Sequence, residues 1–152
     1  MHERGAFGIG TDSNVAIDAA VELRMLEYGQ RLLHRARNVL AIDQTRSTGR
    51  QLFEIAVDGG ARALGVARPT ESARSGLVAG APADIVTLNA THPSLAGRER
   101  DALLDSWLFT GGAKSVDCVW VRGRQVVAGG RHDARDNVAA RYRRVIADIL
   151  ET

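Results

Sequence analysis

The chain has 152 residues, of which 45% are hydrophobic and 25% are charged, and its formal net charge is +2. This composition is typical of a folded globular protein, and the length is too short for a complete (β/α)8 barrel, which takes about 250 residues. The small net charge predicts no nucleic-acid partner. No apolar run approaches the roughly 20 residues that cross a bilayer, so we expect no membrane association and, by default, a cytoplasmic location.

The only cysteine is Cys118, so an internal disulfide is excluded. It lies in an apolar run and is interpreted as a small buried hydrophobic residue. Two groups of arginines fall on the polar faces of predicted helices, where a solvated face is favoured over a phosphate-binding patch. These groups are Arg31, Arg35 and Arg37, and Arg141, Arg143 and Arg144.

The first predicted element is a short apolar strand that begins at Phe7 and ends in the carboxylate of Asp12, followed by the small polar residues Ser13 and Asn14. Side chains at the carboxyl end of a buried strand often carry chemistry, because they point out of the sheet into a crevice. Asp12 at such an end could hold a divalent cation or take a proton from a bound water. The alternative is that these residues form only a turn and a helix cap, since their side chains readily accept backbone hydrogen bonds.

A long helix is predicted next, from a cap at Asp18 to about Leu40, because apolar residues recur at helical spacing. The single histidine on this helix, His34, is interpreted as a surface residue.

A second helix is predicted from about Gly49 to Leu64, with Ser47 or Thr48 as its cap. Gly59 and Gly60 lower its helix propensity and indicate close approach of a neighbouring backbone. Gly65 is expected to end it. Residues 66–75 are interpreted as a linker.

From residue 76 the pattern becomes strand-like. A strand is predicted over Ala83–Leu88, followed by an irregular stretch over 89–105. The segments Val116–Val121 and Gln125–Ala128 bracket a glycine turn and predict a β-hairpin. A final helix is expected to open at Asp133 or Asp136 and to pack against another part of the protein.

Three segments together resemble the C-terminal third of the metal-dependent amidohydrolase superfamily. They are the strand ending in Gly10-Thr11-Asp12-Ser13, the run from Gly76-Leu77 through Gly80 to Ala83-Asp84-Ile85-Val86, and Val121-Arg122-Gly123-Arg124. More narrowly, Glu22–Leu32, Arg37-Asn38 and Asp105–Phe109 look like the corresponding parts of the formimidoylglutamate deiminase family.

The resemblance implies an α/β fold, namely the C-terminal part of a (β/α)8 amidohydrolase barrel with a small β-sandwich domain and a terminal helix. Residues 1–75 would then hold the last barrel strand and the following helices, 76–132 the β-rich domain, and 133–152 the C-terminal helix.

The activity that the resemblance implies is hydrolysis of N-formimino-L-glutamate to N-formyl-L-glutamate and ammonia, in histidine catabolism. Asp12 would bind zinc and move a proton, and Ser13 and Asn14 would orient the substrate or cap the next helix.

One departure from the superfamily pattern is important. A catalytic zinc site takes at least three protein ligands, and this chain offers only Asp12. The four histidines, His2, His34, His92 and His132, are isolated from one another in the sequence. We therefore expect the chain to be inactive alone, to have a complementing N-terminal barrel chain as its partner, or to self-associate through apolar faces left uncovered. The alternatives are a non-catalytic interaction module and a related deaminase that acts on a different C=N substrate.

Overall fold

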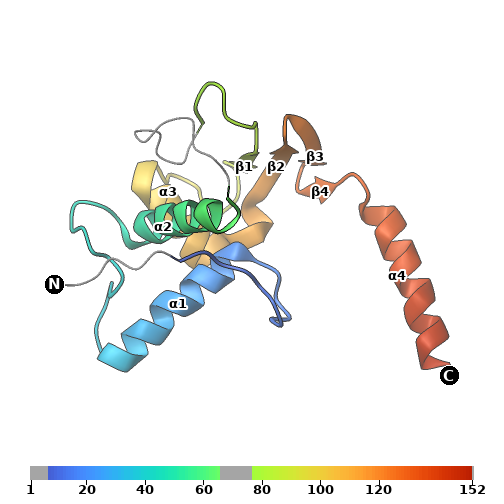
Figure 1. The fold of residues 1–152 in the computed structure, drawn as a ribbon, viewed down its shortest axis with the longest axis horizontal. Helices are drawn as coiled ribbons and strands as arrows, with labels where there is room; N and C mark the ends of the chain where they lie inside the picture. Colours follow the sequence, from blue (N-terminus) through green and yellow to red (C-terminus); the bar gives the residue numbers. More distant parts are fainter. Residues whose placement is uncertain (1–6, 66–76, 152) are drawn as a thin grey trace. The chain divides into compact units, whose positions relative to one another are not determined.

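The computed structural model describes residues 7–65 and 77–151. These residues divide into two compact units (Figure 1). The helical unit comprises the described residues of Met1–Ala81 together with Asn89–Ser115, and the sheet unit comprises those of Pro82–Leu88 and Val116–Thr152. Within the described part of the chain, no helix is long and apolar enough to cross a membrane.

Residues 7–11 are irregular and Asp12 lies in a turn, so the strand predicted there is absent from the described structure. A strand exists only through hydrogen bonds to a partner, and the strands of this chain pair with one another in a separate sheet. The backbone of Phe7 instead passes against the second helix, where a Cβ built on Gly59 would lie 2.0 Å from the Phe7 carbonyl oxygen. The close approach predicted at Gly59 is therefore confirmed.

Helix α1 spans Ala19–His34, and the carboxylate of Asp18 caps it by accepting from the backbone N–H of Ala20. The cap is as predicted, but the helix ends well before Leu40. Arg35 adopts a left-handed conformation (φ 49°), and the chain turns back over the helix. The apolar spacing continues beyond the helix because Leu40 packs against the same core.

Helix α2 spans Thr48–Ala63 and has Ser47 as its N-cap, as predicted. Gly65 follows its end with φ 65°, the left-handed conformation that glycine adopts at low cost. The linker predicted over 66–75 lies outside the described residues.

Residues 89–115 are more helical than predicted. Helix α3 spans Arg100–Ser106 and continues into one π-helical turn, η1 (Trp107–Gly111), and one 3-10 turn, η2 (Gly112–Ser115). This segment packs with α1 and α2, and Leu108 joins their core. The core consists of Leu23, Leu52, Ala56 and Leu108. Of residues 77–132, the segments 77–81 and 89–115 belong to the helical unit, and 82–88 and 116–132 belong to the sheet unit.

The sheet unit holds one antiparallel sheet with strand order β1-β2-β3-β4. Its strands are β1 (Ile85–Leu88), β2 (Val116–Val121), β3 (Arg124–Ala128) and β4 (Arg131–His132). The predicted hairpin is confirmed: Arg122 and Gly123 both have positive φ, as a two-residue turn of type I′ requires.

Helix α4 spans Arg135–Leu150 and has no buried residue. Neither predicted acidic cap is used, because Ala134 occupies the N-cap position, and Asp136 lies in the first turn and pairs with Arg131. The apolar positions Val138, Tyr142, Val145 and Ile149 are all exposed. Within the described part of the chain, the packing predicted for the apolar face of α4 is therefore not formed.

Candidate functional site

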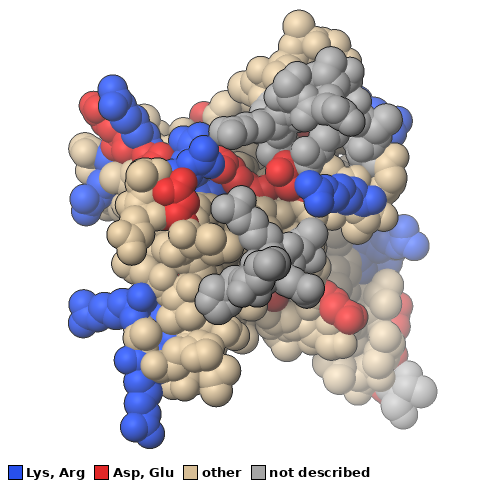
Figure 2. Space-filling model, turned by 60° about the vertical axis from the view of Figure 1, so that its left-hand side comes forward, with Lys and Arg blue, Asp and Glu red and all other residues tan. Residues whose placement is uncertain are grey.

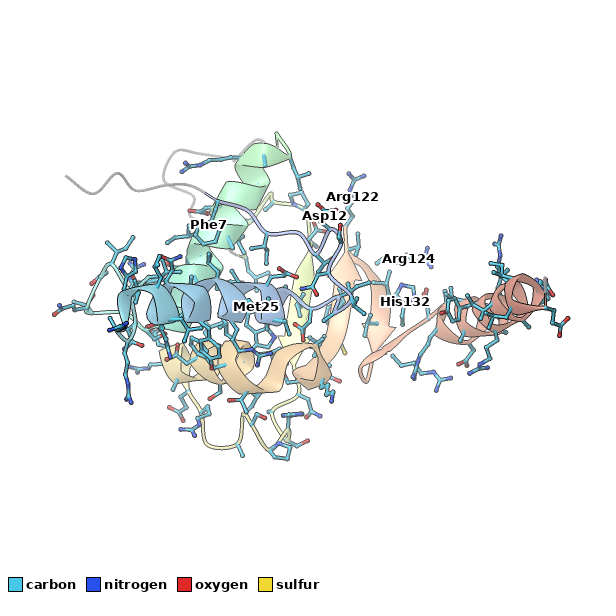
Figure 3. The ribbon with its side chains drawn as sticks, turned by 90° about the horizontal axis from the view of Figure 1, so that it is seen from below. Phe7, Asp12, Met25, Arg122, Arg124 and His132 are labelled. Atoms are coloured by element: carbon cyan, nitrogen blue, oxygen red, sulfur yellow. The ribbon has the colours of Figure 1, made fainter. Side chains whose placement is uncertain are left out.

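The predicted site residues lie in a turn ahead of α1. The N–H of Asn14 donates to the carbonyl oxygen of Thr11 at 2.6 Å, which closes the turn. Asp12 has φ 37°, a conformation that few residues other than glycine adopt, although aspartate tolerates it better than most. Its side chain is exposed, and Figure 3 shows Asp12 on the loop that leads into α1. A strained backbone of this kind is common at functional sites.

Contacts on the C-terminal side anchor this turn to the helical unit. The side-chain amide of Asn14 donates to Glu22 at 2.7 Å. The two carboxylate oxygens of Asp18 accept separately, one from the N–H of Ala20 and the other from the N–H of Ala113, each at 2.9 Å. Gly112 lies against the same carboxylate: it has φ 57°, and a Cβ there would lie 2.6 Å from Asp18 Oδ2. The loop carrying Asp12 therefore has a fixed C-terminal end.

The structure does not assemble a metal site from the described residues. Among residues 7–65 and 77–151, no group of three or more His, Cys, Asp or Glu side chains could hold a metal ion. Asp12 and Ser13 are exposed and Asn14 is half-buried. The chain's own described residues therefore do not fit a complete zinc centre.

The described histidines have local roles instead. His92 Nδ1 accepts from the N–H of Ser94, and His132 Nδ1 accepts from the N–H of Ala134. His34 is exposed in the last turn of α1. His2 lies outside the described residues.

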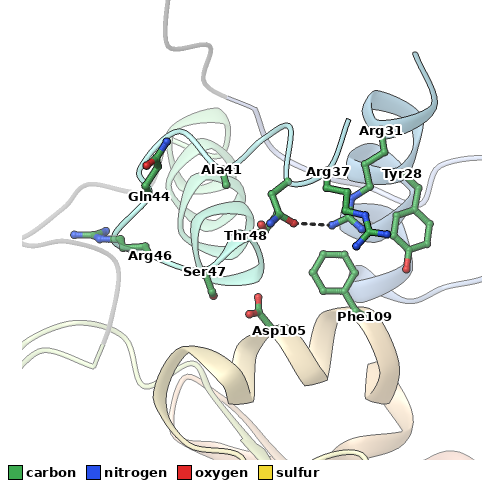
Figure 4. Close-up of a pocket in the computed structure, with 11 residues that line it drawn as sticks. Tyr28, Arg31, Arg37, Ala41, Gln44, Arg46, Ser47, Thr48, Asp105 and Phe109 are labelled. Atoms are coloured by element: carbon green, nitrogen blue, oxygen red, sulfur yellow. Dashed lines mark hydrogen bonds between the residues drawn. The ribbon is translucent and has the colours of Figure 1, made fainter. Parts of the chain in front are cut away.

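At the other end of α1 the structure forms a polar pocket of about 700 Å³, which no motif in the sequence indicates (Figure 4). It is lined by Tyr28, Arg31, Arg37, Asn38, Ala41, Gln44, Arg46, Ser47, Thr48, Asp105 and Phe109. Arg31 and Arg37 were assigned to a solvated helix face, but helix α1 ends between them. The clustering of these arginines is the one feature of the sequence that could have indicated this pocket.

An ion-pair network lies near the start of α2. Asp101 accepts from the N–H of Ser47 and pairs with Arg50, and Arg50 also pairs with Glu54. The N–H of Ser47, and then the Arg50 guanidinium, hold the pKa of Asp101 below its ordinary value. The hydrogen bonds that the Arg50 guanidinium donates to Asp101 and Glu54 raise the pKa of Arg50 in turn. This network joins α2 to α3.

The charges on the face shown in Figure 2 form no continuous basic patch. Lys and Arg side chains stand apart on that face, with acidic and uncharged residues between them.

No family model matches the chain. The chain is 44% identical over 151 residues to formimidoylglutamate deiminase of Pseudomonas aeruginosa, and the match covers 99% of this chain and 32% of that protein. It also matches the crystal structure of an amidohydrolase from Brucella melitensis with a TM-score of 0.82 and 48% identity, over 96% of this chain and 30% of that one.

The structural match therefore makes the chain a relative of the amidohydrolases. Within that class, it is homologous to formimidoylglutamate deiminase, which confirms the predicted resemblance to the C-terminal portion of that family. The chain spans about a third of the length of both relatives.

Proposed function

We propose that this chain supplies the C-terminal part of a hydrolase that converts N-formimino-L-glutamate and water into N-formyl-L-glutamate and ammonia, a step of histidine catabolism. The observation that carries the proposal is the 44% identity to a formimidoylglutamate deiminase along 99% of the chain.

The Asp12 turn is the part of the chain that we assign to the active site. Its exposed carboxylate projects from a strained turn, and Asn14 and Asp18 hold that turn against α1. This arrangement suits a residue that must reach substrate or cation atoms contributed by another segment. Ser13 and Asn14 are proposed to orient the substrate, with Asn14 also positioning the turn through Glu22.

Zinc is proposed as the metal of the complete hydrolase, with Asp12 as one of its ligands. The described residues hold no group that could complete such a site. We propose that the remaining ligands come from outside the described residues, from a complementing chain, and we expect the chain alone to be inactive.

The same reasoning extends to the fold of the assembled enzyme. Residues 7–10 are proposed to become the last strand of the barrel once partner strands supply hydrogen bonds, and β1–β4 to form part of a small β-sandwich. Exposed apolar residues on α1 support this proposal. They are Met25, Leu26, Leu32 and Leu33. We propose that a complementing chain covers them in the active protein and that self-association covers them without it.

A complementation assay tests the function. The chain is purified alone, and also co-expressed with the portion of the Pseudomonas aeruginosa deiminase that it does not match, and ammonia release from N-formimino-L-glutamate is measured with added zinc. We expect no turnover above background alone and measurable turnover with the complement.

Two variants assign the activity to the Asp12 turn. Asp12→Ala should abolish the complemented activity, whereas Glu151→Ala, which removes an exposed carboxylate at the end of α4, should leave it unchanged. Turnover by the chain alone would contradict the proposed inactivity. Full activity of the complemented Asp12→Ala variant would contradict the role of Asp12.

A further inference from the structure

The polar pocket at the C-terminal end of α1 is lined by none of the residues assigned to the proposed hydrolysis. Its volume of about 700 Å³ is in the range of small-molecule sites. Asp18 caps α1, and Tyr28, the first residue of α1 that lines the pocket, follows ten positions later, so about 15 Å of helix separates the cap from the pocket. No residue of the Asp12 turn lines the pocket.

One wall of the pocket carries two guanidinium groups, Arg31 and Arg37, which Figure 4 shows on the same side as Tyr28. Arg31 pairs with Glu27 at 2.6 Å, and its guanidinium carbon lies 5.3 Å from the ring centres of both Tyr28 and Phe109. Arg37 is exposed and makes no ion pair or side-chain hydrogen bond with any described residue. This wall therefore offers one positive charge that the described chain does not neutralise.

The loop that carries Arg37 is held in place by the carboxylate of Glu27 on helix α1. The Glu27 carboxylate is fully buried, and it accepts from the N–H groups of Val39 and Leu40 at 3.1 and 3.0 Å. Within the loop, Asn38 has φ 52° and accepts from Arg31. Because these contacts fix the loop backbone, a ligand that binds Arg37 has to order only the Arg37 side chain and not the loop.

The rest of the lining holds one carboxylate, Asp105, and a third guanidinium, Arg46, which pairs with Asp43 and Glu54. The carboxylate of Asp105 lines the pocket, and one of its oxygens accepts a hydrogen bond of 2.7 Å from the N–H of Gly49 at the start of α2. Figure 4 shows Asp105 across the pocket from the two arginines. A purely anionic ligand such as phosphate would meet this carboxylate unfavourably, whereas a ligand that carries both a carboxylate and an ammonium group matches both walls.

We propose that this pocket binds a small zwitterion, an α-amino acid, with its carboxylate on Arg37 and its ammonium group on Asp105. The proposal depends only on the geometry of the pocket and not on the hydrolase activity, so either can fail without the other.

Calorimetric titration of the chain tests it with three probes: L-glutamate, glutarate, which lacks the ammonium group, and inorganic phosphate. We expect saturable binding of L-glutamate and weaker binding of the other two. Arg37→Ala should weaken L-glutamate binding by about tenfold or more. Arg141→Ala, the same change on the exposed polar face of α4, should not affect it.

The variant Asp105→Asn tests the role of the Asp105 charge in binding the ammonium group. Asparagine keeps an oxygen for the N–H of Gly49, so helix α2 retains its contact, and circular dichroism checks that both variants fold. This variant should lose the preference for L-glutamate over glutarate. The proposal is overturned if L-glutamate does not bind saturably, if phosphate or glutarate binds the unmodified chain as tightly, or if neither variant changes the binding.

Discussion

The helical unit and the sheet unit differ in how their side chains are buried. Every buried residue in the described part of the chain lies in the helical unit, including the core residues Leu23, Leu52 and Leu108. The sheet unit has half-buried and exposed residues only, so its strands are joined mainly by backbone hydrogen bonds. A small sheet gains independent stability only when a hydrophobic face is covered. The comparison indicates that the sheet unit depends more on a partner than the helical unit does.

The largest expected effect is that of truncating the helical core. Leu52 is fully buried, and Leu52→Ala should lower the free energy of unfolding by about 2–5 kcal/mol through lost contacts and a cavity. Val127→Ala on the half-buried face of β3 should cost only about 1 kcal/mol. Denaturant unfolding measures both, followed by the fluorescence of Trp107 in the helical unit and Trp120 in the sheet unit, each in a variant with the other replaced by phenylalanine. Equal losses of unfolding free energy in the two variants would contradict the proposed difference in burial between the two units.

The next effect concerns the buried carboxylate of Glu27. In Glu27→Gln an amide NH2 replaces one of the two oxygens that accept from Arg31, Val39 and Leu40, so a backbone N–H loses its acceptor. We expect a loss of about 1.5–3 kcal/mol, typical of hydrogen bonds to a charged group. Amide hydrogen exchange should rise at Val39 and Leu40 more than in β2, and unchanged exchange at these two amides would contradict the role of Glu27.

A pair of adjacent glycines gives a matched test of the contact with the N-terminal segment. A Cβ on Gly59 would collide with the carbonyl of Phe7, whereas a Cβ on Gly60 would meet nothing within 4 Å. Gly59→Ala should therefore cost about 1–3 kcal/mol in overpacking, less the gain in helix propensity, while Gly60→Ala should gain up to about 1 kcal/mol. Thermal unfolding of the two variants should move in opposite directions, and a common direction would argue against this packing.

The smallest effect is a pH dependence at Asp101. The pKa of its carboxyl is lowered in the folded state, so the charged form stabilises the fold at pH values above its ordinary pKa of 3.8. This contribution is lost as the pH falls below that value towards the lowered pKa. Asp101→Asn should flatten the decline of stability between about pH 5 and pH 2, measured by denaturant midpoints. An unaltered decline would show that other carboxylates cause it.

Local signals predicted most of the helical unit and the hairpin. The caps Asp18 and Ser47, the stop at Gly65 and the turn at Arg122-Gly123 each depend on neighbouring residues, so the sequence alone is enough to find them. Helix α3 was missed because it is only seven residues long and has no buried residue, which leaves no periodic apolar stripe.

Other features depend on contacts between distant residues. The early end of α1 is fixed by the bonds from Val39 and Leu40 to Glu27, which helical periodicity does not reveal. The strand predicted over residues 7–12 needs neighbours that the described chain lacks, although Asp12 does lie in an exposed turn. The polar pocket joins α1 to Asp105, and nothing in the local sequence around either indicates that they meet.

The carboxylate of Asp18 joins Ala20 to Ala113, and the backbone of Gly112 fits beneath it. In a saturation library, codon 112 should therefore tolerate almost no replacement, whereas codon 10, where an added side chain meets no described atom, should accept many. Position 112 thus limits how far this protein can diverge in evolution while it keeps the loop of Asp12 in place.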